Sequence, residues 1–212
     1  IVFRPYTSEK ELVNKYGSFI FDEFNSKIKL KIFGKHNMQN LAGAKTVCEQ
    51  LGIKPKDFYK SITSYELPHK RLQKLNKNKT KIFRDFAHSP SKLKATISAV
   101  KSQYSENLLS IYELHSSSSF NSKFLKNYKN TLTDSDYSII YISMKNLKKF
   151  SSKMDEKIIK KIFNEDKLIL ISDPKKLDSF LKKNSYNDYN KLFMSSGNFD
   201  NFILDELDNE SK

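Results

Sequence analysis

The run R-D-F-A-H-S-P at positions 84–90 places a carboxylate and an imidazole where a buried strand is expected to end. Ser89 and Pro90 predict a helix start, because a serine N-cap accepts a hydrogen bond from the first turn and proline at N1 loses none. In open α/β sheets, ligands bind at the carboxyl ends of strands, near helix N-termini that favour anions. Asp85 and His88 are therefore candidates for binding a nucleotide or a phosphorylated substrate. The alternative is that they only cap and solvate the turn.

A second cluster, G-K-H-N-M-Q-N at positions 34–40, combines amide side chains with an expected helix start. Asn37 is a natural N-cap, and Asn40 lies one turn further along. Amide side chains both donate and accept hydrogen bonds, which matches the adjacent donor and acceptor groups of a purine edge. The cluster predicts either an adenine contact or simply an N-cap with a polar turn beside it.

A third cluster, L-P-H-K-R-L at positions 67–72, lies where the pattern of the chain changes. Arg71 suits phosphate recognition, because its planar guanidinium binds oxyanions bidentately and stays charged. A basic surface hinge is the alternative interpretation.

The elements around these clusters indicate a smaller first part of the chain. Lysine alternates with apolar residues over 27–33, which predicts a half-exposed strand near a sheet edge. A helix is expected from about 37 to 51, with Gly52 as its stop. Pro55 opens a short helix, and the segment 66–81 reads as a domain junction followed by a surface hairpin or loop.

From position 82 onward, strands and helices alternate. Strands are expected at 82–86, 108–114, 136–143, 167–172 and 191–195, and helices at 90–104, about 120–132, 154–163 and 174–183. This alternation implies right-handed βαβ units. The predicted fold class is α/β: a Rossmann-like, mainly parallel sheet with flanking helices over 69–212, preceded by a smaller domain over 1–68.

Composition narrows the function classes. The 212 residues include 16 Phe and 11 Tyr, enough for a real core, and no apolar stretch approaches the roughly 20 residues of a membrane span. No signal-peptide pattern is present, and the single Cys48 excludes an internal disulfide and suits a reducing cytoplasm. The net charge of +14 comes from lysines scattered along almost every element, so we do not expect nucleic acid as the main partner.

Other kinds of site are disfavoured by spacing. His36, His88 and His115 lack the spacing of zinc ligands, so no metal site is predicted. The serine run 116–119 lacks a G-x-S-x-G frame, and the chain contains no G-x-x-x-x-G-K-[ST] phosphate loop.

The order of the three clusters resembles the Mur ligases, which add amino acids or peptides to UDP-N-acetylmuramate in peptidoglycan synthesis. The match continues through E-L-H-S-S-S-S-F-N at 113–121 and M-S-S-G-N-F-D at 194–200. These two runs look most like the murein tripeptide ligase branch, which uses L-alanyl-γ-D-glutamyl-meso-diaminopimelate, with the L-alanine-adding branch as its nearest relative. The alanine-adding relatives carry basic residues where this chain has the serines 116–119, which favours a peptide amine.

The resemblance implies the end of a central ATP-binding domain (1–68) and a complete C-terminal domain (69–212) of a cytoplasmic ligase. ATP and Mg²⁺ are the implied cofactors, with the magnesium ligands expected mainly upstream of this chain. By analogy, Asn37 and Asn40 would meet the adenine beside His36, Arg71 would reach the phosphates, and Asp85 would bind the ribose. The implied substrate contacts are His88, Ser89, His115, Ser118, Ser119, Ser196, Gly197 and Asn198, and no catalytic residue is assigned.

The implied reaction is ATP-driven amide formation. The muramoyl carboxylate attacks the γ-phosphate to give an acyl phosphate, and the incoming amine then displaces phosphate through a tetrahedral intermediate. The protein would contribute positioning and charge stabilisation, and domain closure would exclude water. Because the phosphate loop and a UDP-binding domain are missing, we expect no ligase activity from this chain alone. A non-catalytic basic module that binds nucleotide or nucleic acid is the competing class.

Overall fold

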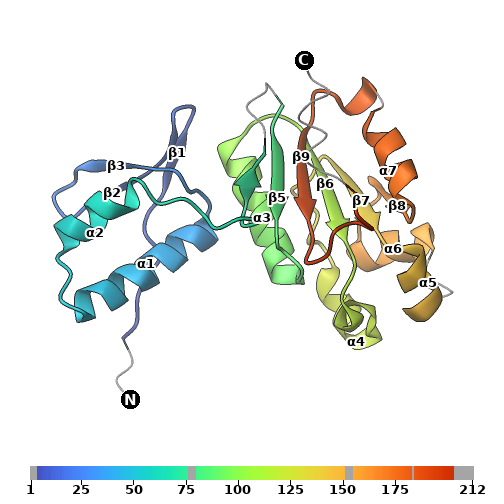
Figure 1. Cartoon of the computed structure of the whole chain (residues 1–212), viewed down its shortest axis with the longest axis horizontal. Helices are drawn as coiled ribbons and strands as arrows, with labels where there is room; N and C mark the ends of the chain where they lie inside the picture. The colour runs from blue at the N-terminus through green and yellow to red at the C-terminus, as the bar shows by residue number, and fades with distance from the viewer. Residues whose placement is uncertain (1–3, 76–79, 151–154, 183, 203–212) are drawn as a thin grey trace. The chain divides into compact units, whose positions relative to one another are not determined.

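The computed structural model describes residues 4–75, 80–150, 155–182 and 184–202, and the chain divides into two compact units (Figure 1). The first unit comprises Ile1–Pro68 with Ser98–Ser105, and the second comprises His69–Ile97 with Glu106–Lys212. The assignment of 1–68 to a central ATP-binding domain and of 69–212 to a C-terminal domain stays a prediction.

The first unit is a three-stranded antiparallel sheet with two helices. Its strands follow the order β1 (Leu12–Asn14), β2 (Gly17–Phe21) and β3 (Lys27–Leu30). The predicted edge position of the lysine-alternating strand is confirmed, because among the described strands β3 pairs only with β2, and both of its lysines are exposed. Helices α1 (Lys35–Gln50) and α2 (Pro55–Ile62) bury Met38 and Phe58 in the core of this unit.

The start of α1 differs from the prediction. The helix begins at Lys35, and its N-cap is Gly34 with a φ of 95°. Asn37 is the third helical residue, and its Nδ2 donates to the Phe33 carbonyl oxygen at 2.8 Å, so the predicted N-cap is wrong. The reason is the glycine, which adopts a positive φ at low cost and turns the chain into the helix before the amide is reached. Gly52, with a φ of 81°, follows the end of the helix as predicted.

The second unit contains a six-stranded sheet in the order β4-β5-β9-β6-β7-β8. The strands are β4 (Gln73–Lys74), β5 (Ile82–Asp85), β6 (Leu108–Glu113), β7 (Tyr137–Tyr141), β8 (Leu168–Ile171) and β9 (Asn190–Met194). Only β4 runs antiparallel to its neighbour, so the predicted mainly parallel sheet is confirmed. The last strand, β9, lies between β5 and β6 and runs parallel to both. The carboxyl ends of these three strands therefore lie next to one another at one edge of the sheet.

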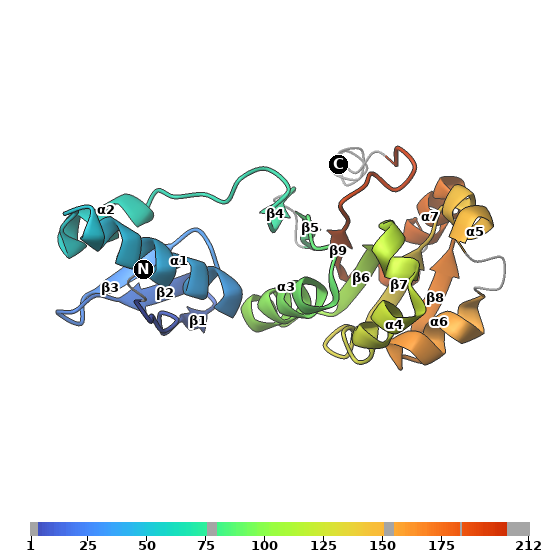
Figure 2. The same cartoon turned by 90° about the horizontal axis from the view of Figure 1, so that it is seen from below.

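Helices cover both faces of this sheet. Figure 2 shows α3 (Pro90–Gln103), α4 (Ser122–Leu125) and α6 (Glu156–Phe163) on one face and α7 (Pro174–Leu181) on the other. On the α7 side, Leu177 packs in one buried cluster with Tyr141 and Phe193. A further helix, α5 (Met144–Phe150), was not predicted. No helix in the described part of the chain is long and apolar enough to cross a bilayer.

The predicted helix over 120–132 is broken in the structure. It consists of a 3₁₀ turn (Ser117–Phe120), α4 and a second 3₁₀ turn (Lys126–Tyr128). Asn121 causes the break, because its side chain caps α4 by accepting from the Lys123 backbone N–H at 3.0 Å. The predicted start of α7 is confirmed: Pro174 is at its first turn, and the Asp173 side chain accepts from the Lys175 N–H at 2.8 Å. Part of the predicted surface hairpin, 76–79, lies outside the described residues.

Candidate functional site

Three predicted segments meet at the carboxyl edge of the second unit's sheet. Strands β5, β9 and β6 are neighbours, and their register sets Asp85 beside Met194 and Tyr112 beside Met194. His88 and Ser89 follow β5, His115 follows β6, and the turn 196–198 follows β9. We call this group the carboxyl-edge site. It brings together segments that lie far apart in the sequence.

Asp85 is a structural anchor of the carboxyl-edge site. Its buried carboxylate accepts hydrogen bonds from the Leu72 N–H at 2.6 Å, the Ala87 N–H at 2.8 Å and the Thr96 hydroxyl at 3.2 Å. The first of these holds the segment beside Arg71, where Leu72 has a positive φ of 42°. Of the two roles open from the sequence, the structure supports turn capping directly, and a ribose contact stays a prediction.

Phe86 contacts both basic side chains at this end of β5. The His88 Nδ1 lies 2.9 Å from the Phe86 carbonyl oxygen, and the two rings meet edge to face with centroids 5.2 Å apart. The guanidinium of Arg71 lies 5.2 Å from the centroid of the Phe86 ring, and the residue is exposed. Helix α3 begins at Pro90, directly after Ser89, as predicted. An exposed guanidinium held over an aromatic face is available to an anion.

Glu113 is the residue of this site that the sequence reasoning missed. It ends β6, all of whose residues are buried, and it is only 3% exposed. Its Oε2 accepts hydrogen bonds from the Ser195 hydroxyl and from the Phe199 N–H, the latter at 3.0 Å. Its Oε1 lies 3.5 Å from the Nδ1 of His115, whose side chain is 48% exposed. A charged residue at the end of a strand made mostly of apolar and aromatic residues was the available signal.

The turn after β9 is tightly organised. The Ser195 hydroxyl accepts from the Gly197 N–H at 2.6 Å, and the Asn198 amide donates to the Asn201 side chain at 2.6 Å. Three successive residues have positive φ values: Phe199 (51°), Asp200 (55°) and Asn201 (66°). Ser196 and Gly197 are partly buried and Asn198 is exposed, so this predicted substrate segment is reachable from solvent.

Tyr141 fixes the far end of the same turn. Its hydroxyl donates to the Asp200 carboxylate at 2.7 Å, and its ring packs against Phe199 with centroids 5.7 Å apart. Burial, together with the Asp200 carboxylate, raises the pKa of Tyr141 well above its usual value. The phenol therefore stays a hydrogen-bond donor at physiological pH.

The serine segment after His115 points partly into the core. Ser119 is buried, and its hydroxyl lies 2.6 Å from that of Ser116 and 3.0 Å from that of Tyr128. Tyr128 in turn lies 2.8 Å from the Tyr112 hydroxyl, which completes a buried hydroxyl chain. The structure thus places the Ser119 hydroxyl inside the fold, against the expectation that it faces substrate, because the buried tyrosine hydroxyls need hydrogen-bond partners. The side chain of Ser118 lies outside the described residues.

The remaining predicted nucleotide contacts lie on the first turns of α1, in the first unit. His36 is partly buried and Asn40 is exposed, whereas the buried Asn37 already uses its amide N–H on Phe33. In the described ranges, no group of three or more His, Cys, Asp or Glu side chains could hold a metal ion.

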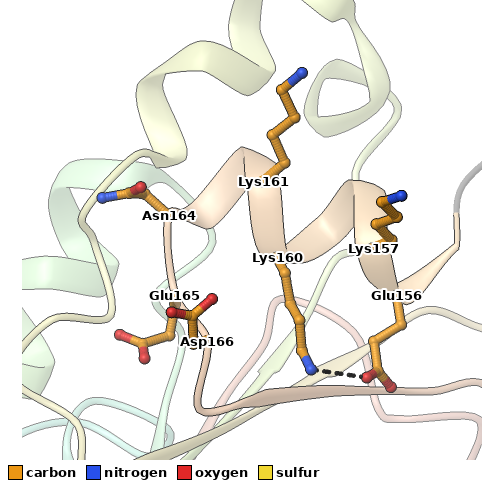
Figure 3. A pocket seen from close by; sticks show the side chains of 7 residues that line it. All are labelled: Glu156, Lys157, Lys160, Lys161, Asn164, Glu165 and Asp166. Atoms are coloured by element: carbon orange, nitrogen blue, oxygen red, sulfur yellow. Dashed lines mark ion pairs between the residues drawn. The ribbon is translucent and has the colours of Figure 1, made fainter.

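A separate surface hollow surrounds the end of α6. It is lined by Glu156, Lys157, Lys160, Lys161, Asn164, Glu165 and Asp166 (Figure 3). The Lys160 ammonium pairs with the Glu156 carboxylate at 3.0 Å. Figure 3 shows this pair as a dashed line, with the Lys157 and Lys161 side chains pointing away from it. Lysines and acidic side chains are equal in number here, and none of the predicted site residues lines the hollow. It is therefore not a candidate for the predicted chemistry.

Comparison with known proteins identifies the relatives of the chain. No protein-family model matches it. It is 27% identical over 189 residues to a UDP-N-acetylmuramate–L-alanine ligase of Acetivibrio thermocellus, a match that covers 85% of this chain and 40% of the relative. The chain is a homologue of the Mur ligases. A second UDP-N-acetylmuramate–L-alanine ligase, from Ruthia magnifica, is 32% identical over 108 residues, covering 47% of the chain and 23% of that protein.

Solved structures show the same fold for this Mur ligase homologue. A UDP-N-acetylmuramate–alanine ligase from Thermotoga maritima superposes with a TM-score of 0.71 at 17% identity, covering 98% of this chain and 46% of that one. A murein peptide ligase from Psychrobacter arcticus gives a TM-score of 0.59 at 18% identity, covering 92% and 39%. The predicted family resemblance is confirmed, and the preference for the tripeptide branch stays a prediction. The homologue spans less than half the length of these relatives.

Proposed function

We propose that this Mur ligase homologue supplies the amine-binding part of an ATP-dependent ligase that extends UDP-N-acetylmuramate in peptidoglycan synthesis. The observation that carries the proposal is the meeting of three motif segments at the carboxyl ends of β5, β9 and β6. Ligands of open α/β sheets bind at this edge. The relatives that share the chain's sequence are named for joining L-alanine to UDP-N-acetylmuramate.

Two amines are candidates for the second substrate. L-Alanine is favoured by the curated relatives. The tripeptide is favoured by the segment 113–121, in which His115 is the sole side chain that can carry a positive charge. A free amino acid places its carboxylate next to the reacting amine and so calls for a nearby cation, whereas a peptide can be held along its length by neutral hydrogen-bonding groups.

Individual groups at the carboxyl edge suit this role. The half-exposed imidazole of His115 can accept the proton that an attacking amine must lose. Ser196 and Asn198 offer neutral hydrogen-bonding groups on the reachable part of the turn. Buried contacts beneath them keep the backbone of the turn in one conformation, which is what positioning of a nucleophile requires.

The residues present fit ATP in part. In the first unit, the exposed amide of Asn40 suits an adenine. In the second unit, the exposed guanidinium of Arg71 suits a phosphate. The Asp85 carboxylate already accepts three hydrogen bonds, so we assign it to holding the segment beside Arg71. Bound ATP with Mg²⁺ would supply the phosphoryl group that activates the carboxylate. In the described ranges, no acidic cluster is suited to that Mg²⁺.

The test is a titration of the purified 212-residue chain with L-alanine, the tripeptide and duplex DNA at low and high salt. We expect saturable binding of one amine, which weakens in His115→Ala and is unchanged in Ser110→Ala, a buried position three residues before the end of β6. Salt-sensitive DNA binding without amine binding would support the competing basic-module class. Phosphate release from ATP with UDP-N-acetylmuramate and amine should be absent. Turnover would refute the expectation that further domains are needed.

A further inference from the structure

We propose that Glu113 is a positioning residue of the carboxyl-edge site, whose single buried carboxylate holds both the turn 195–199 and His115 in place. The part that concerns an amine ligand rests on the proposed function. The part that concerns the turn rests on the geometry alone, and the two can be tested separately.

One carboxylate organises alternate residues of the turn. Glu113 Oε2 accepts from the Ser195 hydroxyl and from the Phe199 N–H, and the Ser195 oxygen in turn accepts from the Gly197 N–H. Ser195 is 9% exposed and Phe199 is 3% exposed, so water cannot easily replace these bonds. Residues 195, 197 and 199 are therefore tied to a strand that lies more than eighty positions earlier in the sequence.

Gly197 shows how closely the turn approaches the carboxylate. A Cβ at this position would lie 2.7 Å from Oε2 and 3.1 Å from the Cδ of Glu113. A glutamate tip can usually move aside, but this one is held by its bonds to Ser195 and Phe199. Position 197 therefore requires a glycine, because the backbone comes so close to the Glu113 carboxylate that any side chain would push the carboxylate off its partners.

The second oxygen of Glu113 faces His115. Oε1 lies 3.5 Å from Nδ1, so one ring nitrogen is directed toward the carboxylate and Nε2 is the nitrogen left for a ligand. The two predicted substrate segments, one after β6 and one after β9, therefore share one anchor. Burying a carboxylate costs free energy unless it is paired and hydrogen-bonded, and the contacts described supply that compensation.

The test uses four variants of the 212-residue chain: Glu113→Ala, Glu113→Gln, Gly197→Ala and the double variant Glu113→Ala/Gly197→Ala. Ser110→Ala is the matched control, because Ser110 is a buried polar residue of the same strand whose hydroxyl pairs with Ser135 instead. Two quantities are measured by NMR: hydrogen exchange of the Gly197 and Phe199 amides, and affinity for L-alanine and for the tripeptide.

Glu113→Ala should speed exchange of both amides and weaken amine binding, each by about tenfold. The Phe199 N–H loses its charged acceptor, and the Ser195 hydroxyl that accepts from the Gly197 N–H loses the carboxylate that holds it. In Glu113→Gln both amides should exchange as slowly as in the parent chain, since an amide oxygen can accept from Ser195 and Phe199. Gly197→Ala should perturb the turn in the parent chain and add no further effect in the Glu113→Ala background, where the space is free. Ser110→Ala should match the parent in both measurements.

Specific outcomes overturn the inference. Unchanged exchange in Glu113→Ala, or additive effects of Glu113→Ala and Gly197→Ala, would show that the carboxylate does not hold the turn. If the parent binds an amine and Glu113→Ala binds it equally well, the positioning role is wrong while the proposed function survives. If exchange responds as expected but no variant, the parent included, binds either amine, the proposed function fails and the amine-related half of this inference fails with it.

Discussion

Replacing Asp85 by alanine should be the most damaging single substitution at the carboxyl edge. The carboxylate accepts from the Leu72 N–H, the Ala87 N–H and the Thr96 hydroxyl, at 2.6, 2.8 and 3.2 Å. All three donor residues are buried, at 5%, 1% and 3% exposed. Each unsatisfied buried donor costs about 1–3 kcal/mol, so the three donors together predict a loss of about 3–9 kcal/mol in the free energy of unfolding. That is a large share of the 5–15 kcal/mol, in order of magnitude, that stabilises a typical domain.

The measurement is urea unfolding followed by far-UV circular dichroism, because the chain contains no tryptophan. Asp155→Ala is the matched control: it also removes an aspartate, but one that caps α6 through a single exposed bond to the Ile158 N–H. Loss of such a cap costs about 1 kcal/mol. An Asp85→Ala variant no less stable than Asp155→Ala would refute the anchoring role and return Asp85 to a ligand-binding role alone.

Three further predictions concern other parts of the fold. Tyr128→Phe should lower the free energy of unfolding by about 1–2 kcal/mol, because it removes the buried hydrogen bonds that the Tyr128 hydroxyl makes with Ser119 and Tyr112; urea unfolding measures this, and a neutral result would contradict it. Gly52→Ala should destabilise α1 by about 1 kcal/mol, since its φ of 81° favours glycine; an unchanged thermal midpoint would refute that. The Lys160 ammonium and a backbone N–H lower the pKa of Glu156, so its contribution to stability is present at neutral pH and is lost as the pH falls through that lowered pKa. The urea midpoint should therefore depend less on pH below 5 in Glu156→Gln than in the parent chain, and identical pH profiles would count against the pair.

Much of the fold could be predicted because the signals are local. Lysine alternation at 27–33 indicated an edge strand, and Asp173-Pro174 indicated a helix start; both are confirmed. The failures are equally local in origin. At the start of α1, the N-cap is Gly34, so the helix has already begun when the chain reaches Asn37. In the segment 120–132, the side chain of Asn121 caps a new short helix, so no long helix runs through it.

The site was less predictable than the fold, because burial and partners depend on strand order. Ser119 looked like a surface serine of a polar run, yet its hydroxyl is taken by Tyr128, a residue whose depth in the core the local pattern does not report. Glu113 was treated only as the last residue of a largely apolar strand. Its importance depends on contacts with Ser195 and Phe199, which no spacing rule connects to it.

The position of β9 is what turns separate motifs into one site. The chain proceeds outward from β6 through β7 to β8, and then returns to insert its last strand between β5 and β6. Without β9, no strand would link β5 to β6, and no turn would lie between their carboxyl ends. With it, the turn after β9 fills the gap, Ser195 donates its N–H to the Asp85 carbonyl oxygen at 3.0 Å, and its hydroxyl reaches Glu113 on the other side. Reversal of strand order is where open α/β sheets form their binding crevices, so the same step of topology accounts for both the rigidity of the turn and its place in a candidate substrate site.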